Sequence, residues 1–149
     1  MPASSNSPEG IGGSRHRWRV AEALALLLLA RMLVALVPFR WWRNSLGEIV
    51  SAPDALPGGL AVPAQALGAV VKAHRRAVQR LPIEVKCLPQ AMALQWMLHR
   101  RGLPSVLTVA ALPKAGRGKL DDLHAWVSTA GEILVGESSL PYVPLLHLG

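Results

Sequence analysis

The hydrophobic period of the chain changes at Pro104, and this change limits the possible folds more than any other feature. Before Pro104, apolar residues recur every three or four positions, which predicts a helix over residues 87–101. Gly102 stands where a left-handed helix cap is favoured, and a proline cannot continue the helix. Residues 105–112 are then nearly continuously apolar and partly β-branched, which is typical of a strand covered on both faces.

The residues after this strand predict a small antiparallel sheet. Residues 123–127 and 132–135 flank the sequence Ser-Thr-Ala-Gly, a four-residue connection of hairpin length. Symmetric pairing across this connection places His124 opposite Val135. The apolar tail over 140–149 holds two prolines and is expected on the surface of the core. Helices followed by a small antiparallel sheet define the α+β class.

Residues 20–37 form the longest apolar run, so their length and charges bear on a membrane location. The run is shorter than the roughly twenty apolar residues of a transmembrane helix, and Glu22 and Arg31 interrupt it. No cleavage site of small residues follows it, which argues against a signal peptide. We expect a helix that ends at Pro38 and packs on the domain or on a partner; peripheral membrane contact is the alternative.

The remaining segments predict one domain with a distinct N-terminal part. Residues 1–14 are rich in Ser, Gly and Pro and are expected to be disordered. Residues 15–63 hold the apolar helix and a loop with several prolines, and residues 64–149 hold the core. Within the core, residues 64–79 have the spacing of an amphipathic helix with a basic outer face. The chain length suits a single domain over residues 15–149.

The charge and the cysteine content of the chain exclude several classes of function. The chain has a formal charge of +7, but few aromatic residues lie near its basic clusters, so no nucleic-acid partner is expected. The single cysteine, Cys87, excludes an intrachain disulfide and a cysteine-only zinc site, and no metal or cofactor is expected. Cys87 is either a small buried apolar residue or a reactive thiol.

The position of Cys87 at the start of the predicted helix favours a reactive thiol. Backbone N–H groups and the positive end of the helix dipole stabilise a thiolate there, and the same groups can hold an oxyanion. A nucleophilic thiol also needs an imidazole as proton acceptor and donor. Of the five histidines, only His124 lies on a strand that can pack against a helix N-terminus, whereas His99 lies three turns along the same helix.

A carboxylate is expected to orient the His124 ring. In the predicted hairpin, Glu137 projects on the same face as Val135 and lies diagonal to His124. Asp121 and Asp122 are the alternatives from the preceding loop. Each of these acids is also a candidate for an ordinary solvated surface residue.

Two motifs in this half of the chain resemble one known family. Residues 87–104 read CLPQAMALQWMLHRRGLP, and residues 123–137 read LHAWVSTAGEILVGE. Both resemble the transglutaminase-like leader peptidases of lasso peptide biosynthesis, which carry a C-L-x-[RQ]-[SA] helix ending in R-G-[IV]-P and an H-A-W-V hairpin. The resemblance extends from about residue 66 to the end. The apolar helix running into VPFRWWR also resembles the opening of the standalone family form, which lacks a fused leader-recognition domain.

The resemblance implies a transglutaminase-like or papain-like cysteine protease core. Such an enzyme cuts the leader from a ribosomally made precursor, after which an asparagine-synthetase-like cyclase forms the macrolactam. A small leader-recognition protein would deliver the precursor, and the location would be the cytoplasm. Cys87 matches the family nucleophile, and His124 matches its general base and acid. The third family residue is usually an Asp, but Gly136 holds that position; either the neighbouring Glu137 takes the role, or the site is a dyad.

Two other functions fit the same residues. A site of Cys87 and His124 could transfer an acyl group to an amine, as transglutaminases do. Alternatively, the chain could be a non-catalytic membrane-surface adaptor built on the 20–37 helix, with Cys87 merely buried. The basic helix over 64–79 and the apolar helix over 20–37 are the candidate docking surfaces for protein or peptide partners.

Overall fold

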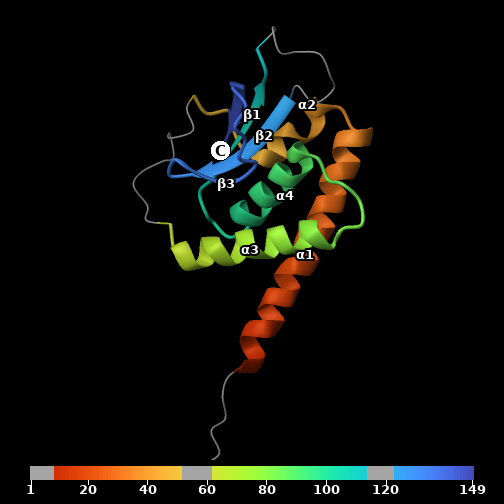
Figure 1. Ribbon diagram of the computed structural model, residues 1–149, viewed down its shortest axis with the longest axis vertical. Helices are drawn as coiled ribbons and strands as arrows, with labels where there is room; N and C mark the ends of the chain where they lie inside the picture. Colours follow the sequence, from red (N-terminus) through yellow and green to blue (C-terminus); the bar gives the residue numbers. More distant parts are fainter. Residues whose placement is uncertain (1–8, 52–61, 114–122) are drawn as a thin grey trace, which may run out of the picture.

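The computed structural model describes residues 9–51, 62–113 and 123–149, and it has the α+β class that the sequence predicts. Helices precede strands along the chain, and the strands form one antiparallel sheet that lies against the helices (Figure 1). The elements in chain order are α1 (Glu9–Leu36), α2 (Phe39–Trp42), the 3-10 helix η1 (Arg43–Leu46), α3 (Ala64–Arg80), α4 (Cys87–His99), β1 (Val106–Ala111), β2 (Leu123–Thr129), β3 (Glu132–Val135) and β4 (Val143–Leu148).

Helix α4 lies at the centre of the fold. Helices α1 and α3 pack on it, and strands β1 and β2 contact it from the sheet (Figure 1). Its buried residues are Pro89, Ala91, Met92, Ala93, Leu94, Gln95, Met97 and Leu98. The helix ends at His99, slightly earlier than predicted. The reason is that Gly102, with φ of 64°, begins a Schellman-type turn in which the Leu103 N–H donates to the carbonyl of Leu98.

The sheet has the strand order β3-β2-β1-β4, and every neighbouring pair is antiparallel. Strand β1 is central and buried along nearly its whole length, as its continuous apolar sequence predicts. The tail lies at the surface, as expected, with most of its side chains exposed; its pairing with β1 as the edge strand β4 was not predicted. Pro144 pairs with Ala110 where the register shifts; an edge strand tolerates proline because one of its sides makes no ladder hydrogen bonds.

The β2–β3 hairpin is tighter than the sequence predicts. Thr129 pairs with Glu132, so only Ala130 and Gly131 form the turn. Both turn residues have positive φ, 47° and 80°. Such a two-residue turn is common in hairpins because its twist matches the twist of the flanking strands. The glycine adopts this conformation readily, whereas the alanine is held in it by the pairing on either side.

The tighter turn changes which residues lie level with His124. Val135 pairs with Val127, and not with His124 as the four-residue connection predicted, so that register is wrong. An irregularity between Val127 and Ser128 shifts the pairing further. Because the turn uses fewer residues, β3 slides along β2, and the segment after Val135 comes next to the start of β2.

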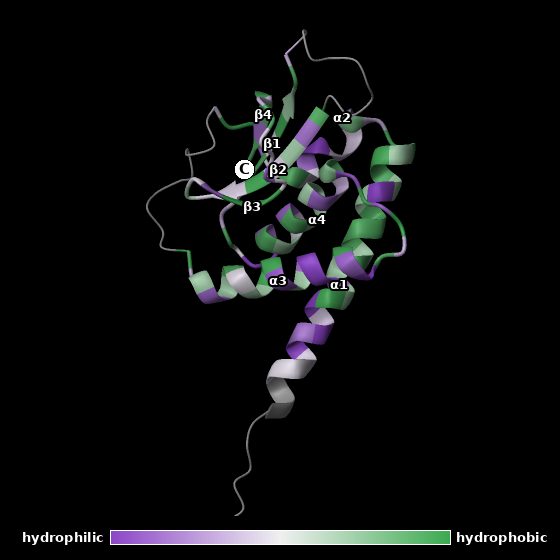
Figure 2. Ribbon diagram, viewed as in Figure 1, coloured by the Kyte–Doolittle hydropathy of each residue, from purple (hydrophilic) through white to green (hydrophobic). Residues whose placement is uncertain are grey.

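Helix α1 begins at Glu9, so residues 9–14, which we expected to be disordered, are helical; residues 1–8 lie outside the described part of the chain. The helix ends at Leu36, before Pro38, close to the predicted end. It packs on α3 and α4, and Figure 2 shows that its apolar character is concentrated in the half nearer α2. Among the described residues, none of the helices has the length and apolar character needed to cross a membrane.

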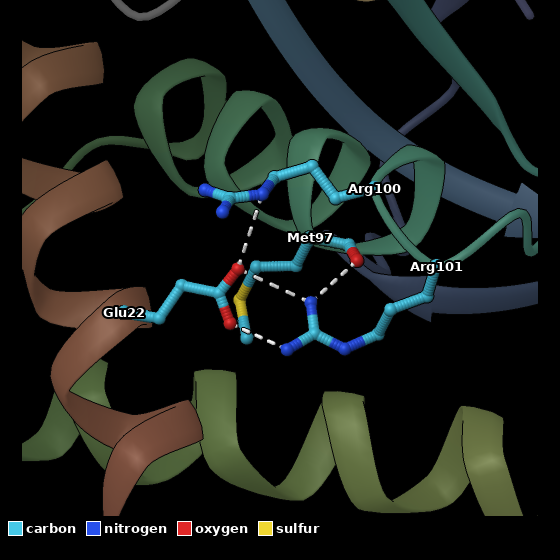
Figure 3. A network of polar contacts seen from close by, with 4 residues as sticks. All are labelled: Glu22, Met97, Arg100 and Arg101. Atoms are coloured by element: carbon cyan, nitrogen blue, oxygen red, sulfur yellow. Dashed lines mark hydrogen bonds and ion pairs between the residues drawn. The ribbon is translucent and has the colours of Figure 1, made fainter.

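Ion pairs fasten α1 to the end of α4. The carboxylate of Glu22 accepts two hydrogen bonds from the guanidinium of Arg101, and the Nε atom of Arg100 lies 3.6 Å from it (Figure 3). Arg101 also donates to the carbonyl of Met97, at 2.8 Å. Arg31, the other charge in the apolar run, donates to a backbone carbonyl in the segment that leads into α4. Both charges therefore have structural partners.

Helix α3 is amphipathic, as predicted. Its buried residues are Val70, Ala73, His74 and Ala77, and its exposed residues include Lys72, Arg75, Arg76 and Arg80. The NH2 group of Arg75 donates to the carbonyl of Leu134 at 3.1 Å, which ties α3 to β3. Most of the loop predicted over residues 51–63 lies outside the described residues, and the division into domains stays a prediction.

Candidate active site

Cys87 is the first residue of α4, and its side chain is half-buried. No side-chain hydrogen bond from the N-cap residue Lys86 caps the helix, and no acidic residue lies in its first turn. The first-turn N–H groups and the positive end of the helix dipole therefore act on the region of the thiol. The side-chain amide of Gln90 donates to the carbonyl of Val85 at 2.5 Å and so holds the segment that enters the helix.

Strand β2 begins next to the start of α4. The Sγ atom of Cys87 lies 3.9 Å from the carbonyl oxygen of Leu123, the first residue of β2. His124 follows directly and is half-buried, and α4 packs against β2. The fold thus brings the predicted nucleophile and the predicted base to the same corner of the molecule.

Two contacts orient the His124 ring. Its Nε2 atom lies 2.7 Å from the carbonyl oxygen of Gly136, which follows β3. Because a carbonyl only accepts hydrogen bonds, Nε2 carries the proton, and Nδ1 is the acceptor nitrogen of the neutral ring. The ring of Tyr142 stacks on the imidazole, with centroids 4.8 Å apart and planes 21° apart. Neighbouring groups therefore determine both the tautomer and the plane of the ring.

A glycine is required at position 136. Its φ is 85°, and a Cβ atom there would lie 2.4 Å from the carbonyl oxygen of Ala125 and 2.9 Å from the Cα atom of Trp126. The hairpin therefore leaves no room for an Asp side chain at the position where the resembling family usually carries one. The main-chain carbonyl of the same residue contacts His124 instead.

Among the described residues, no contact joins a predicted acidic residue to His124. Glu137 is exposed and makes no hydrogen bond or ion pair within the described residues. Asp121 and Asp122 lie outside those residues. An orienting carboxylate therefore stays a prediction. In the described ranges, no three His, Cys, Asp or Glu side chains are grouped as a metal site requires.

Sequence reasoning missed Tyr142 and the carbonyl of Gly136. Tyr142 belongs to the tail that we expected on the surface, and no local pattern connects it with His124 before the fold is known. The glycine did carry a signal, because a lone glycine at the end of a strand often marks a close approach of two backbones. That signal predicts the close approach, but it does not predict that the carbonyl of this glycine contacts His124.

A second histidine supports the first turn of α4. His74 is fully buried, and its Nε2 atom lies 2.9 Å from the carbonyl oxygen of Gln90. Nε2 must donate to this carbonyl, so Nδ1 is a buried acceptor, and none of the described residues pairs with it. Burial lowers the pKa of His74 from 6.5 to about 4, although the hydrogen bond to Gln90 opposes this shift. His74 is therefore neutral at pH 7 and fixes the turn that carries Cys87.

The comparisons with known proteins point to one superfamily. A family model described as the transglutaminase-like superfamily matches residues 33–146, which is most of the chain and includes Cys87 and His124. No curated protein and no solved structure matches the chain. The superfamily is generally of cysteine protease or acyltransferase type, and the predicted transglutaminase-like core is confirmed. The chain belongs to the transglutaminase-like superfamily.

Proposed function

We propose that the protein is a cysteine peptidase that removes the leader peptide from a ribosomally synthesised lasso peptide precursor. The observation that carries this proposal is the meeting of Cys87, at the start of α4, with the start of β2, where the His124 ring is held through Nε2. Superfamily membership supports a cysteine protease or acyltransferase. The two sequence motifs, over residues 87–104 and 123–137, favour the leader peptidase among these.

In the proposed reaction, Nδ1 of His124 takes the proton of the Cys87 thiol as the sulfur attacks the scissile carbonyl carbon. Backbone N–H groups at the start of α4 hold the negative oxygen of the tetrahedral intermediate. His124 then protonates the leaving amine, which becomes the N-terminus of the core peptide, while the leader remains as a thioester on Cys87. Water loses a proton to Nδ1, attacks the thioester, and releases the leader carboxylate and the thiol.

The carbonyl of Gly136 takes the place of an orienting carboxylate in this proposal. Its hydrogen bond with the Nε2–H group leaves Nδ1 as the basic nitrogen, and the stacked ring of Tyr142 maintains the plane of the imidazole. A neutral carbonyl stabilises an imidazolium less than a carboxylate does, because it carries only a partial charge. The proposed site is therefore a dyad of Cys87 and His124.

The proposed partners are the precursor leader, a small recognition protein that delivers it, and an asparagine-synthetase-like cyclase that consumes the freed amine. The proposed location is the cytoplasm. The outer face of α3 is the proposed docking surface for the leader or the recognition protein, because basic side chains surround a hollow there and would attract an acidic segment. This hollow has a volume of about 560 Å³ and is lined by Gly68, Val71, Lys72, Arg75, Arg76 and Gln79.

The test is cleavage of a synthetic precursor in the presence of the recognition protein, followed by mass spectrometry. Cys87→Ala and His124→Ala should fold like the wild type and lower the cleavage rate at least about a thousandfold. His16→Gln removes an imidazole from α1 and serves as the matched control, which should keep its activity. Undiminished cleavage by Cys87→Ala would end the proposal.

Glu137→Gln distinguishes the two ways of orienting His124. If the Gly136 carbonyl is sufficient, turnover should stay within about twofold of the wild type. A loss of about tenfold or more would assign the orienting role to the carboxylate, as the hairpin predicted from the sequence suggests. Glu132→Gln changes another exposed carboxylate of the same hairpin and is the control, and Asp121→Asn and Asp122→Asn complete the series.

The second candidate function is transfer of the acyl group from Cys87 to an amine. Superfamily membership favours it, because the superfamily includes acyltransferases as well as proteases. Adding a primary amine to the cleavage reaction separates the two functions. A product whose mass includes the amine would identify the transferase, whereas a free leader carboxylate at every amine concentration would identify the peptidase.

The non-catalytic adaptor predicts an unreactive Cys87. In a Cys–His site, iodoacetamide should alkylate the native protein rapidly near neutral pH, and His124→Ala should slow this reaction. Intact-protein mass spectrometry measures both rates. A thiol that reacts only after denaturation would favour the adaptor over both enzymes.

A further inference from the structure

Helix α1 carries two apolar stripes, and only one of them packs on the core. The packed stripe consists of Val20, Ala23, Leu27 and Ala30. The other stripe faces solvent, and its residues recur every three or four positions, as residues on one face of a helix do. The residues of this exposed stripe are Trp18, Ala21, Ala25, Leu28, Leu29, Met32 and Leu36.

The exposed stripe is long and well exposed for the surface of a small domain. The exposed fractions of Trp18, Met32 and Leu36 are 74%, 55% and 70%. From Trp18 to Leu36 the stripe extends about 27 Å along the helix, at 1.5 Å per residue. Figure 2 shows the apolar half of α1 on the outside of the helical layer. A continuous apolar surface of this kind marks a site of interaction.

The charges around the exposed stripe are positive. Arg15 and Arg17 precede it on α1, and an exposed arginine follows it in each of α2 and η1. Glu22 is the single acidic residue of the sequence between positions 10 and 47. Its carboxylate is already engaged by Arg101, just after α4 (Figure 3). The surface therefore combines an apolar centre with a basic border.

This combination favours an anionic lipid surface over a second copy of the chain. If two copies met through the exposed stripe, their arginines would approach each other without acidic partners, and like charges oppose such an interface. A transmembrane position does not fit either, since no helix of the described ranges is long and apolar enough to span a bilayer. An interfacial helix instead buries one apolar face at the headgroup boundary, while basic residues contact the phosphates.

We propose that the exposed stripe binds the surface of an anionic phospholipid bilayer, with the axis of α1 parallel to the membrane plane. Trp18 lies at one end of the stripe and Trp41 follows the other end, and both side chains are exposed. Tryptophan is enriched where the acyl chains meet the headgroups. Lipid binding requires no catalysis, so its test is independent of the proposed peptidase activity.

The test is cosedimentation of the full chain with vesicles of phosphatidylcholine alone or of phosphatidylcholine mixed with phosphatidylglycerol. Binding to the anionic vesicles should be about tenfold stronger than to the neutral ones and should weaken with added salt. The double variant Leu29→Gln/Met32→Gln should bind about tenfold more weakly than the wild type. Leu145→Gln, at an exposed leucine of β4, is the matched control and should bind like the wild type.

A second pair of variants tests the basic border. Arg15→Gln/Arg17→Gln should weaken binding about tenfold, whereas Lys72→Gln/Arg76→Gln removes the same charge from α3 and should change binding less than about twofold. Circular dichroism confirms that each variant is folded before it is compared.

Three results would overturn the proposal. The first is a wild-type protein that stays in the supernatant with anionic vesicles. The second is a Leu29→Gln/Met32→Gln variant that sediments like the wild type, because charge alone would then explain the binding. The third is a dimer, detected by light scattering, that the same double variant dissociates, since the stripe would then be an interface between two copies.

Discussion

Helices α4 and α1 are both rich in apolar residues, yet they are covered to very different extents. Most residues of α4 are buried, whereas α1 buries one stripe and exposes another. Position explains the difference: α4 lies between α1, α3 and the sheet, and α1 lies on the outside of the helical layer (Figure 1). The apolar composition of a helix therefore does not tell how much of its circumference is covered, because its neighbours decide that.

The polar residues of the two helices differ in burial in the same way. Gln95 of α4 is fully buried, and its amide nitrogen lies 3.2, 3.2 and 3.1 Å from the carbonyls of Leu46, Ser105 and Leu148. Glu22 of α1 instead reaches sideways to α4 and remains partly accessible. A buried polar group must be hydrogen-bonded, so Gln95 connects α4 to three other segments.

The largest expected contrast between the two helices is in the free energy of unfolding. Leu94→Ala removes a fully buried side chain of α4 and should lower the free energy of unfolding by about 4 kcal/mol, because a cavity remains in the core. Leu29→Ala makes the same change in the exposed stripe and should lower it by less than about 1 kcal/mol. Denaturant titration measures both values. Similar losses for the two variants would refute the distinction between a covered and an uncovered helix.

Acid should weaken the region around the first turn of α4. Below pH 6.5 the unfolded chain protonates His74, whereas the folded chain resists protonation until its pKa of about 4. Stability is therefore lost as the pH falls, by about 3 kcal/mol between pH 6.5 and pH 4. Burial also lowers the pKa of His99, so protonation of His99 on acidification also lowers the stability of the fold.

The variant His74→Leu tests the assignment of this pH dependence. It should be less stable at neutral pH, because the carbonyl of Gln90 loses its donor, but its stability should fall less steeply on acidification. Urea titrations at several pH values give the two slopes. Equal slopes for the variant and the wild type would place the titrating group elsewhere.

Gln95→Leu tests the buried polar contacts of α4. The substitution keeps the approximate volume but removes the donor shared by three buried carbonyls, so the free energy of unfolding should fall by about 2 kcal/mol. Gln79→Leu, at an exposed glutamine of α3, is the control and should change it by less than about 0.5 kcal/mol. A stabilised Gln95→Leu variant would show that the three carbonyls find other partners.

The smallest expected effect concerns the fastening of α1 to α4. Glu22→Gln removes the charge from the contact with Arg101 and should lower the free energy of unfolding by about 1 kcal/mol. A double-mutant cycle with Arg101→Gln isolates the interaction energy. If the two single effects simply add, the ion pair contributes nothing to the docking of α1.

The start of α4 and the strand of His124 were predictable because each depends on nearby residues. Gly102 and Pro104 end the helix that Cys87 begins, and residues 123–127 and 132–135 flank a connection of hairpin length. The hairpin register was not predictable in this way. Ala130 and Gly131 form a two-residue turn, and that choice displaces every later residue relative to His124.

The sequence by itself determined the succession of helices and then strands, the start of α4, the end of α1 before Pro38 and the residues proposed for the chemistry. These features depend on backbone preferences and on contacts within a few residues. Only the tertiary structure decided that the tail becomes β4, that the carbonyl of Gly136 accepts from His124, and that one stripe of α1 stays exposed. Each of these depends on how segments distant in sequence fit together, as Gly136 does against Trp126, and no local pattern encodes such a fit.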